Sequence, residues 1–203
     1  DIPPAILDEY SLKKHTEKIL NKNTTTADMT SFLGAGCANH YVPAVVDEII
    51  TRGELLTCYG SDGWADHGKF QIFAEYNSML CELLGTEALS VPQYDGGQAL
   101  STAICMANRI NGRTKVLIPA SINPQNKRIV ANYLDSVLAE NAIEQVYVDF
   151  DEKTGLMDMD DLKAKLDGDV TAVVAEAVTF LGVMESQIEE IGKLAKAAGA
   201  EFI

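Results

Sequence analysis

The chain has 203 residues and a formal net charge of −14, and 47% of its residues are hydrophobic. A field this negative repels nucleic acid and anionic membrane surfaces, and no stripe of basic residues offsets it. The sequence has no run of about 18 apolar residues and no secretory leader, so we expect a cytoplasmic protein with no membrane span. Its four cysteines are widely spaced, which favours free thiols in a reducing compartment.

Residues 1–65 are expected to form an N-terminal helical segment with a linker. A short amphipathic helix is predicted over residues 11–21, and a polar linker follows it. A glycine-rich turn at 32–36 then leads to a helix over 43–52, whose first residue would be Pro43 because proline suits the first helical turn.

Residues 66–203 are predicted to form an α/β large domain with a mostly parallel sheet flanked by helices, truncated at its C-terminal end. A helix over 66–84, closed by Gly85, precedes alternating strands and helices. The expected strands are 88–91, 115–118, 145–148, 170–175 and one beginning at 201, and the expected helices are 97–109, 124–138, 159–166 and 185–198. Continuous apolar strands separated by helices are typical of a parallel sheet covered on both faces. Because a sheet that stopped in its last strand would leave an open edge, we expect the natural protein to continue beyond Ile203.

The turn Asp95-Gly96-Gly97 follows the first predicted strand and opens a helix. Backbone N–H groups of Gly96 and Gly97 could cradle a phosphate, since helix N-termini attract anions. Alternatively, Asp95 is the N-cap, and its carboxylate occupies the anion position and repels a phosphate. We favour the cap. The turn matches neither a dinucleotide-binding fingerprint nor a P-loop.

A glycine-rich loop holds the candidate catalytic residues Tyr59, Asp62 and His67. His67 beside Asp66 could act as an acid or a base, whereas Asp66 could instead be the N-cap of the following helix. Spacing alone does not decide between these interpretations.

No metal site is expected, because the three histidines share no ligand spacing. The segment 149–155 superficially resembles a calcium loop, but Lys153 stands where an oxygen ligand is needed. We interpret it as a strand end and a turn at Gly155, followed by a helix capped by Asp158.

Motifs along residues 32–203 carry a family resemblance. The most specific block is Phe32–Cys37 with His40–Ile49, and the looser ones are Phe73–Tyr76, Met79–Gly85, Tyr94–Gly97 with Ala99, Asp151–Leu162 and Phe180–Val183. Together they resemble the glycine dehydrogenase (decarboxylating) subunit 1 family. That family corresponds to the N-terminal half of the P-protein of the glycine cleavage system.

The resemblance implies the large domain of the fold-type I pyridoxal-phosphate transferases and a cytoplasmic dimer or hetero-oligomer. It implies a partner, glycine decarboxylase subunit 2, whose lysine carries pyridoxal phosphate, so this chain would not bind the cofactor covalently. The two subunits would decarboxylate glycine and pass the aminomethyl group to the lipoyl H-protein. By resemblance, Asp95, Gly96 and Gly97, with Asn123, are a vestigial phosphate loop.

Three turns depart from the family pattern. The stretch 60–67 replaces Thr-Pro-Tyr-Gln-Pro-Glu, Asn123-Pro124 replaces His-Pro, and residues 178–182 replace Pro-Asn-Phe-Phe-Gly. Two other functions therefore stay open. One is a non-catalytic interaction or scaffold paralogue, and the other is a pyridoxal-phosphate enzyme whose Schiff-base lysine lies beyond Ile203.

Overall fold

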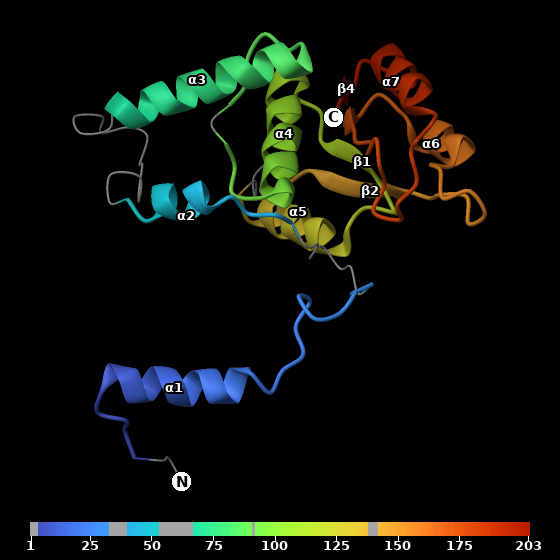
Figure 1. Cartoon of the computed structure of the whole chain (residues 1–203). Coiled ribbons are helices and arrows are strands. Elements are labelled where there is room, and N and C mark those ends of the chain that lie inside the picture. Colours follow the sequence, from blue (N-terminus) through green and yellow to red (C-terminus); the bar gives the residue numbers. More distant parts are fainter. Residues whose placement is uncertain (1–3, 33–39, 53–66, 91, 138–141) are drawn as a thin grey trace. The chain divides into compact units, whose positions relative to one another are not determined.

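The computed structural model (Figure 1) describes residues 4–32, 40–52, 67–90, 92–137 and 142–203. The chain divides into two compact units, residues 1–79 and residues 80–203. The predicted boundary between residues 65 and 66 stays a prediction, because 53–66 lie outside the described ranges. Within those ranges, no helix has the length and apolar character needed to cross a lipid bilayer.

The described part of the first unit consists of helices and connecting segments. Helix α1 (Glu9–Leu20) begins where the Asp8 carboxylate accepts the Ser11 N–H at 2.7 Å. Helix α2 (Ala44–Ile50) begins one residue later than predicted, because Pro43 has the extended backbone of an N-cap (φ −61°, ψ 140°). Helix α3 (His67–Leu84) crosses into the second unit and ends before Gly85, whose φ of 67° suits glycine.

The second unit is built on a parallel sheet with strand order β2-β1-β3-β4 among the described residues. The strands are β1 (Lys115–Pro119), β2 (Glu144–Val148), β3 (Val170–Val173) and β4 (Glu201–Phe202). The helices are α4 (Gly96–Asn111), α5 (Pro124–Val137), α6 (Met159–Lys165) and α7 (Ile188–Ala197). The predicted α/β class with a parallel sheet is therefore confirmed.

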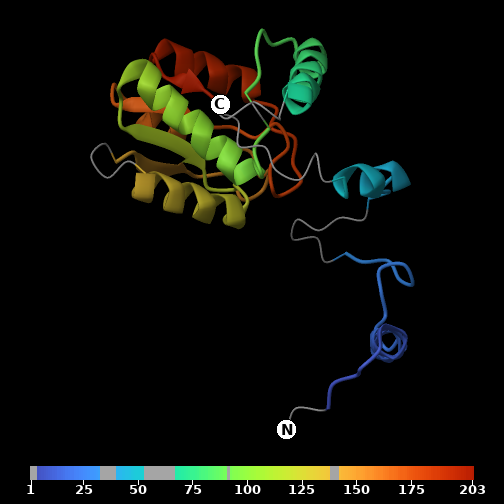
Figure 2. The same cartoon turned by 90° about the vertical axis from the view of Figure 1, so that its left-hand side faces the viewer.

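Helices cover both faces of this sheet (Figure 2). Alternate residues of β1 point to opposite faces. Val116 and Ile118 pack in one core cluster with residues of α4 and α5, whereas Leu117 packs in another with residues of α6 and α7. Each strand of such a sheet is apolar on both sides, which explains the continuous apolar runs in the sequence.

The predicted strand at 88–91 is wrong over the residues that the structure describes. Residues 88–90 have no strand conformation, and residue 91 lies outside the described part. No described strand pairs with this segment, and the next residue, Pro92, has no backbone N–H to donate. An apolar run becomes a strand only where a neighbouring strand accepts its hydrogen bonds.

Candidate functional site at the carboxyl edge of the sheet

Polar residues gather in the segments that follow the parallel strands. Asn123 follows β1, Asp149 follows β2 directly, and Glu176 follows β3. Helix α4 turns at Gly112 into β1, so its N-terminus with Asp95 lies toward this same edge. Ligands of open parallel sheets bind outside the carboxyl ends of the strands. This edge is therefore the candidate site of the second unit.

Asp95 is the N-cap of α4, as the favoured interpretation predicted. Its carboxylate accepts the Gln98 N–H at 2.8 Å. The glycines beside it differ from each other. A Cβ on buried Gly97 would lie 2.9 Å from Cδ1 of Ile129 on α5, whereas one on Gly96 would meet nothing closer than 3.9 Å. Gly97 thus permits the close packing of two helices.

Asn123 has the same capping role at the start of α5. Its Oδ1 accepts the Gln125 N–H at 2.8 Å, and its backbone carbonyl accepts the Lys127 N–H at 3.0 Å. The side chains of Asp95 and Asn123 thus cap the N-termini of α4 and α5, and the Asp95 cap is a carboxylate. These residues do not fit a phosphate group, because Asp95 places a negative charge where the phosphate would lie.

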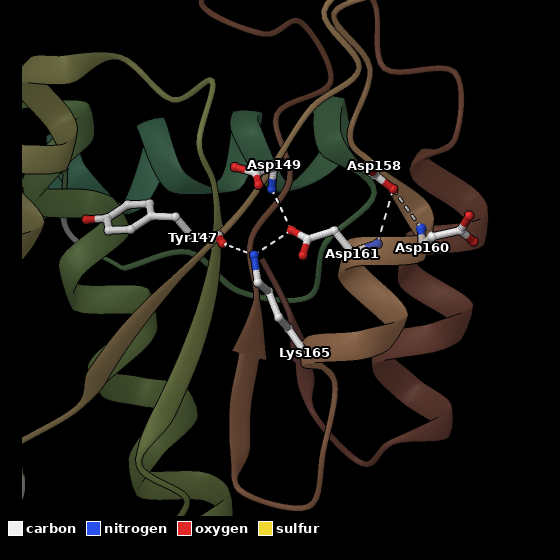
Figure 3. A network of polar contacts seen from close by, with 6 residues as sticks. All are labelled: Tyr147, Asp149, Asp158, Asp160, Asp161 and Lys165. Atoms are coloured by element: carbon white, nitrogen blue, oxygen red, sulfur yellow. Dashed lines mark hydrogen bonds and ion pairs between the residues drawn. The ribbon is translucent and has the colours of Figure 1, made fainter.

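A charged network, which the sequence interpretation missed, holds the end of β2 to α6 (Figure 3). The Asp161 carboxylate accepts the Asp149 N–H at 2.8 Å and the Lys165 ammonium at 2.5 Å. Lys165 also donates to the Tyr147 carbonyl at 2.8 Å. The Lys165 hydrogen bond, more than any other contact, holds the pKa of Asp161 below its usual range. The i,i+4 spacing of Asp161 and Lys165 on a predicted helix was the sequence feature that could have predicted this ion pair.

The segment 149–155, whose sequence superficially resembles a calcium loop, forms a closed turn. One oxygen of Asp151 accepts the N–H groups of Lys153 and Thr154 at 2.9 and 2.8 Å. Asp158 then caps α6, as predicted, by accepting the Asp160 and Asp161 N–H groups. Across the described ranges, no group of three or more His, Cys, Asp or Glu residues could hold a metal ion.

Two more carboxylates lie near the carboxyl edge. Glu176 is half-buried, and burial raises the pKa of its carboxyl, while the Phe180 N–H at 3.4 Å opposes this rise. Glu185 is only 6% exposed and accepts the Met157 N–H at 2.8 Å. It was predicted to begin a helix, but α7 begins three residues later, at Ile188.

The candidate catalytic loop is placed only in part. Tyr59 and Asp62 lie outside the described residues, and His67 is the first residue of α3. Their catalytic role stays a prediction. Of the four cysteines, Cys81 and Cys105 are free thiols, and burial raises the pKa of the Cys105 thiol.

Solved structures share this fold. A glycine decarboxylase (P-protein) of the glycine cleavage system, in inhibitor-bound form, is 28% identical with a TM-score of 0.78, covering 100% of this chain and 44% of that one. A sphingosine-1-phosphate lyase from Burkholderia pseudomallei is 15% identical with a TM-score of 0.62, covering 100% and 48% of the two chains. The fold is that of the large domain of fold-type I pyridoxal-phosphate enzymes.

The family follows from sequence comparison. The model for the glycine cleavage system P-protein matches residues 2–203. Proteins named probable glycine dehydrogenase (decarboxylating) subunit 1 are 33% identical in Thermococcus onnurineus and 35% identical in Thermococcus kodakarensis, each match covering 100% of this chain and 46% of the relative. The chain belongs to the glycine cleavage system P-protein family, and it spans less than half the length of these relatives. The match extends the predicted resemblance, which began at residue 32, almost to the first residue.

Proposed function

We propose that this chain is the subunit 1-like component of a glycine decarboxylase. It would join a second subunit that carries pyridoxal phosphate, decarboxylate glycine with it, and pass the aminomethyl group to the lipoyl H-protein in the cytoplasm. The family match over residues 2–203 supports this function more than any other observation.

The carboxyl edge supports the assignment of the cofactor to the partner. Asp95 caps α4 with a carboxylate, and Asn123 caps α5 with its amide oxygen. Side chains of this chain therefore occupy the N-termini of both helices, where a phosphate would otherwise bind. Glu176, half-buried at the same edge, adds a second acidic group. The chain would therefore act by shaping the site that its partner carries. In this proposal the Asp95–Gly97 turn and Asn123 are what remains of a phosphate loop.

The test mixes the full-length protein with the matching second subunit, the lipoyl H-protein and pyridoxal phosphate. Glycine-dependent exchange of carbon dioxide is measured with and without this chain. We expect activity only when both subunits are present. No stimulation by this chain would contradict the catalytic function and favour a scaffold paralogue.

A spectrum of the isolated full-length protein tests the cofactor assignment. After incubation with pyridoxal phosphate and removal of the free cofactor, we expect no visible absorbance from bound cofactor. Visible absorbance that stays with the protein would instead identify a self-sufficient pyridoxal-phosphate enzyme, if borohydride reduction of the Schiff base then leaves the cofactor covalently attached to a lysine.

A further inference from the structure

Strand β2 lies at one edge of the described sheet, with β1 as its neighbour. The N–H of Glu144 and the carbonyl of Val148 bond to the residues just before and just after β1, both at 2.7 Å. Backbone groups of successive residues in a strand point to opposite sides, so the even-numbered residues of β2 face β1. The backbone groups of Tyr147 and of Asp149, the residue after the strand, therefore point toward the open edge.

Side chains of α6 occupy this open edge (Figure 3). The Lys165 ammonium donates to the Tyr147 carbonyl at 2.8 Å, and the Asp161 carboxylate accepts the Asp149 N–H at 2.8 Å. The Asp149 carbonyl accepts the Asp158 N–H at 2.9 Å. An added strand would need these same backbone groups. Three of the groups that it would need are thus already bonded within the chain.

The two side chains from α6 also hold each other in place. Asp161 and Lys165 are one helical turn apart and bond to each other at 2.5 Å. Their side chains are only 23% and 30% exposed, so water competes less for this pair than for a pair on the surface. The ion pair therefore keeps both groups in position against the backbone of β2.

A second lysine lies beside Tyr147 on the other face of the sheet. Lys127 of α5 places its ammonium 3.7 Å from the centroid of the Tyr147 ring. Lys165 reaches the same residue from α6, and α5 and α6 cover opposite faces. If β2 of a second copy paired here, the lysines of both copies would approach one another and lose water. Lysine side chains are a common means of protecting the edge of a sheet.

The sequence of β2 explains why its edge needs protection. Val146, Tyr147 and Val148 have side chains that favour strands, and residues 145–148 carry no charge. Short uncharged segments of this kind pair readily with copies of themselves when their backbone groups are free. The strand that must be kept away is therefore β2 of a second copy of this chain.

We propose that Asp161 and Lys165 form an edge cap, which prevents β2 of a second copy of this chain from adding to the sheet. The edge cap occupies outward backbone groups, and Lys165 together with Lys127 repels the same charges on the other copy. This inference does not depend on the proposed function, because a chain without activity would need the same protection.

One double variant removes the edge cap, and a second is its matched control. Asp161→Ala with Lys165→Ala deletes both groups and keeps residues that favour a helix. Glu189→Ala with Lys193→Ala removes an ion pair of the same spacing from α7, where the two side chains are 83% and 72% exposed. The two variants thus lose the same charges, but only the first frees backbone groups of β2.

Two further variants separate an open edge from lost stability. Gly97→Ala crowds Ile129 between α4 and α5, and so destabilises the fold without changing the groups at the edge of β2. Gln145→Pro, added to the cap variant, blocks the edge again. The Gln145 N–H points away from β1, so proline removes a donor that only an added strand would use.

Self-association of each full-length variant is followed by sedimentation velocity at neutral pH, well below the melting temperature of each protein. We expect the apparent Kd for association beyond the wild-type state to fall about 10-fold or more in the cap variant, because each copy frees two groups for pairing. Infrared spectra should show added intermolecular strands. The α7 control and Gly97→Ala should associate as the wild type does, and Gln145→Pro should return the cap variant to wild-type behaviour.

The other outcomes overturn the proposal. Unchanged association of the cap variant would mean that another part of the full chain covers β2. Equal association of the cap variant and Gly97→Ala would assign the effect to lost stability, and so would association that Gln145→Pro does not reduce. If the double variant does not fold, Lys165→Ala decides, because it frees the Tyr147 carbonyl and leaves the Asp161 bond to Asp149. Unchanged association of that variant would then refute the edge cap.

Discussion

The helices of the two units differ in how far their apolar side chains are buried. Among the described residues of the first unit, no side chain is buried, and helix α1 exposes Leu12 and Leu20 by 50% and 57%. In the second unit, two apolar clusters fill both faces of the sheet, and residues such as Leu134 and Leu162 are completely buried.

This difference separates the sequence features that place a helix end by themselves from the contributions that require a hydrophobic core. Caps and helix propensity place the ends of α1 without any buried contact, because they act within one turn. In the second unit the same local signals are combined with burial, which supplies most of the stability. Matched substitutions in the two units should therefore differ in their effect on unfolding.

The largest difference is expected for leucine. Leu134→Ala in α5 removes a side chain that is 0% exposed, and it should lower the free energy of unfolding by about 2–5 kcal/mol. Leu12→Ala in α1 should change it by less than about 0.5 kcal/mol. Urea unfolding of the full chain, followed by circular dichroism, measures both. An equal loss in Leu12→Ala would mean that α1 packs against a core in solution.

The second effect concerns close packing inside the second unit. Gly97→Ala places a Cβ against Ile129 and should cost about 1–3 kcal/mol through overpacking. Gly96→Ala, one residue earlier, would make only an ordinary contact with Nδ2 of Asn126 at 3.9 Å and should be neutral or slightly stabilising, because alanine favours the helix. Thermal unfolding of the two variants compares them directly. Similar melting temperatures would refute the packing role of Gly97.

The third effect is electrostatic. Asp161→Asn weakens the network with Lys165 and should cost about 1.5 kcal/mol near neutral pH. Because folding lowers the pKa of Asp161, this stabilisation is present above its unfolded pKa of about 4 and is lost as pH falls through the folded value. The difference between wild type and variant should therefore shrink in urea unfolding at acid pH.

The exposed pair Lys13–Glu17 in α1 is the control for Asp161. Its atoms are 4.0 Å apart, with side chains 72% and 56% exposed, so Glu17→Gln should leave unfolding unchanged at every pH. A constant difference between wild type and Asp161→Asn from neutral to acid pH would show that the lost contact is not ionic.

The smallest of the four effects is the loss of a cap. Asp95→Ala should cost about 1 kcal/mol, whereas Asp95→Asn should cost almost nothing, because asparagine caps as well as aspartate. Asp8→Ala removes the matching cap of α1 and should speed exchange at the Ser11 amide without changing cooperative unfolding. A cooperative change on Asp8→Ala would show that α1 belongs to the folding unit of the sheet.

Local patterns predicted much of the fold and part of the candidate site. The caps Asp95 and Asp158 and the terminating Gly85 lie where the sequence placed them, because each acts on its own helix end. The strand predicted at 88–91 failed over 88–90, because strand formation depends on a paired neighbour. Glu185 was missed because a carboxylate just before a helix usually indicates only the start of that helix.

The sequence by itself determined most of the alternation of strands and helices, the caps Asp95 and Asp158, and the family, since these depend on neighbouring residues or on motifs. Only the tertiary structure shows why residue 97 must be glycine and which backbone N–H group from a distant part of the chain Glu185 binds. Gly97 is limited by Ile129 on another helix, and Glu185 bonds to Met157, which is 28 residues away in the chain. Contacts of this kind arise from the packing of the two faces and the edge of the sheet, which no local pattern encodes.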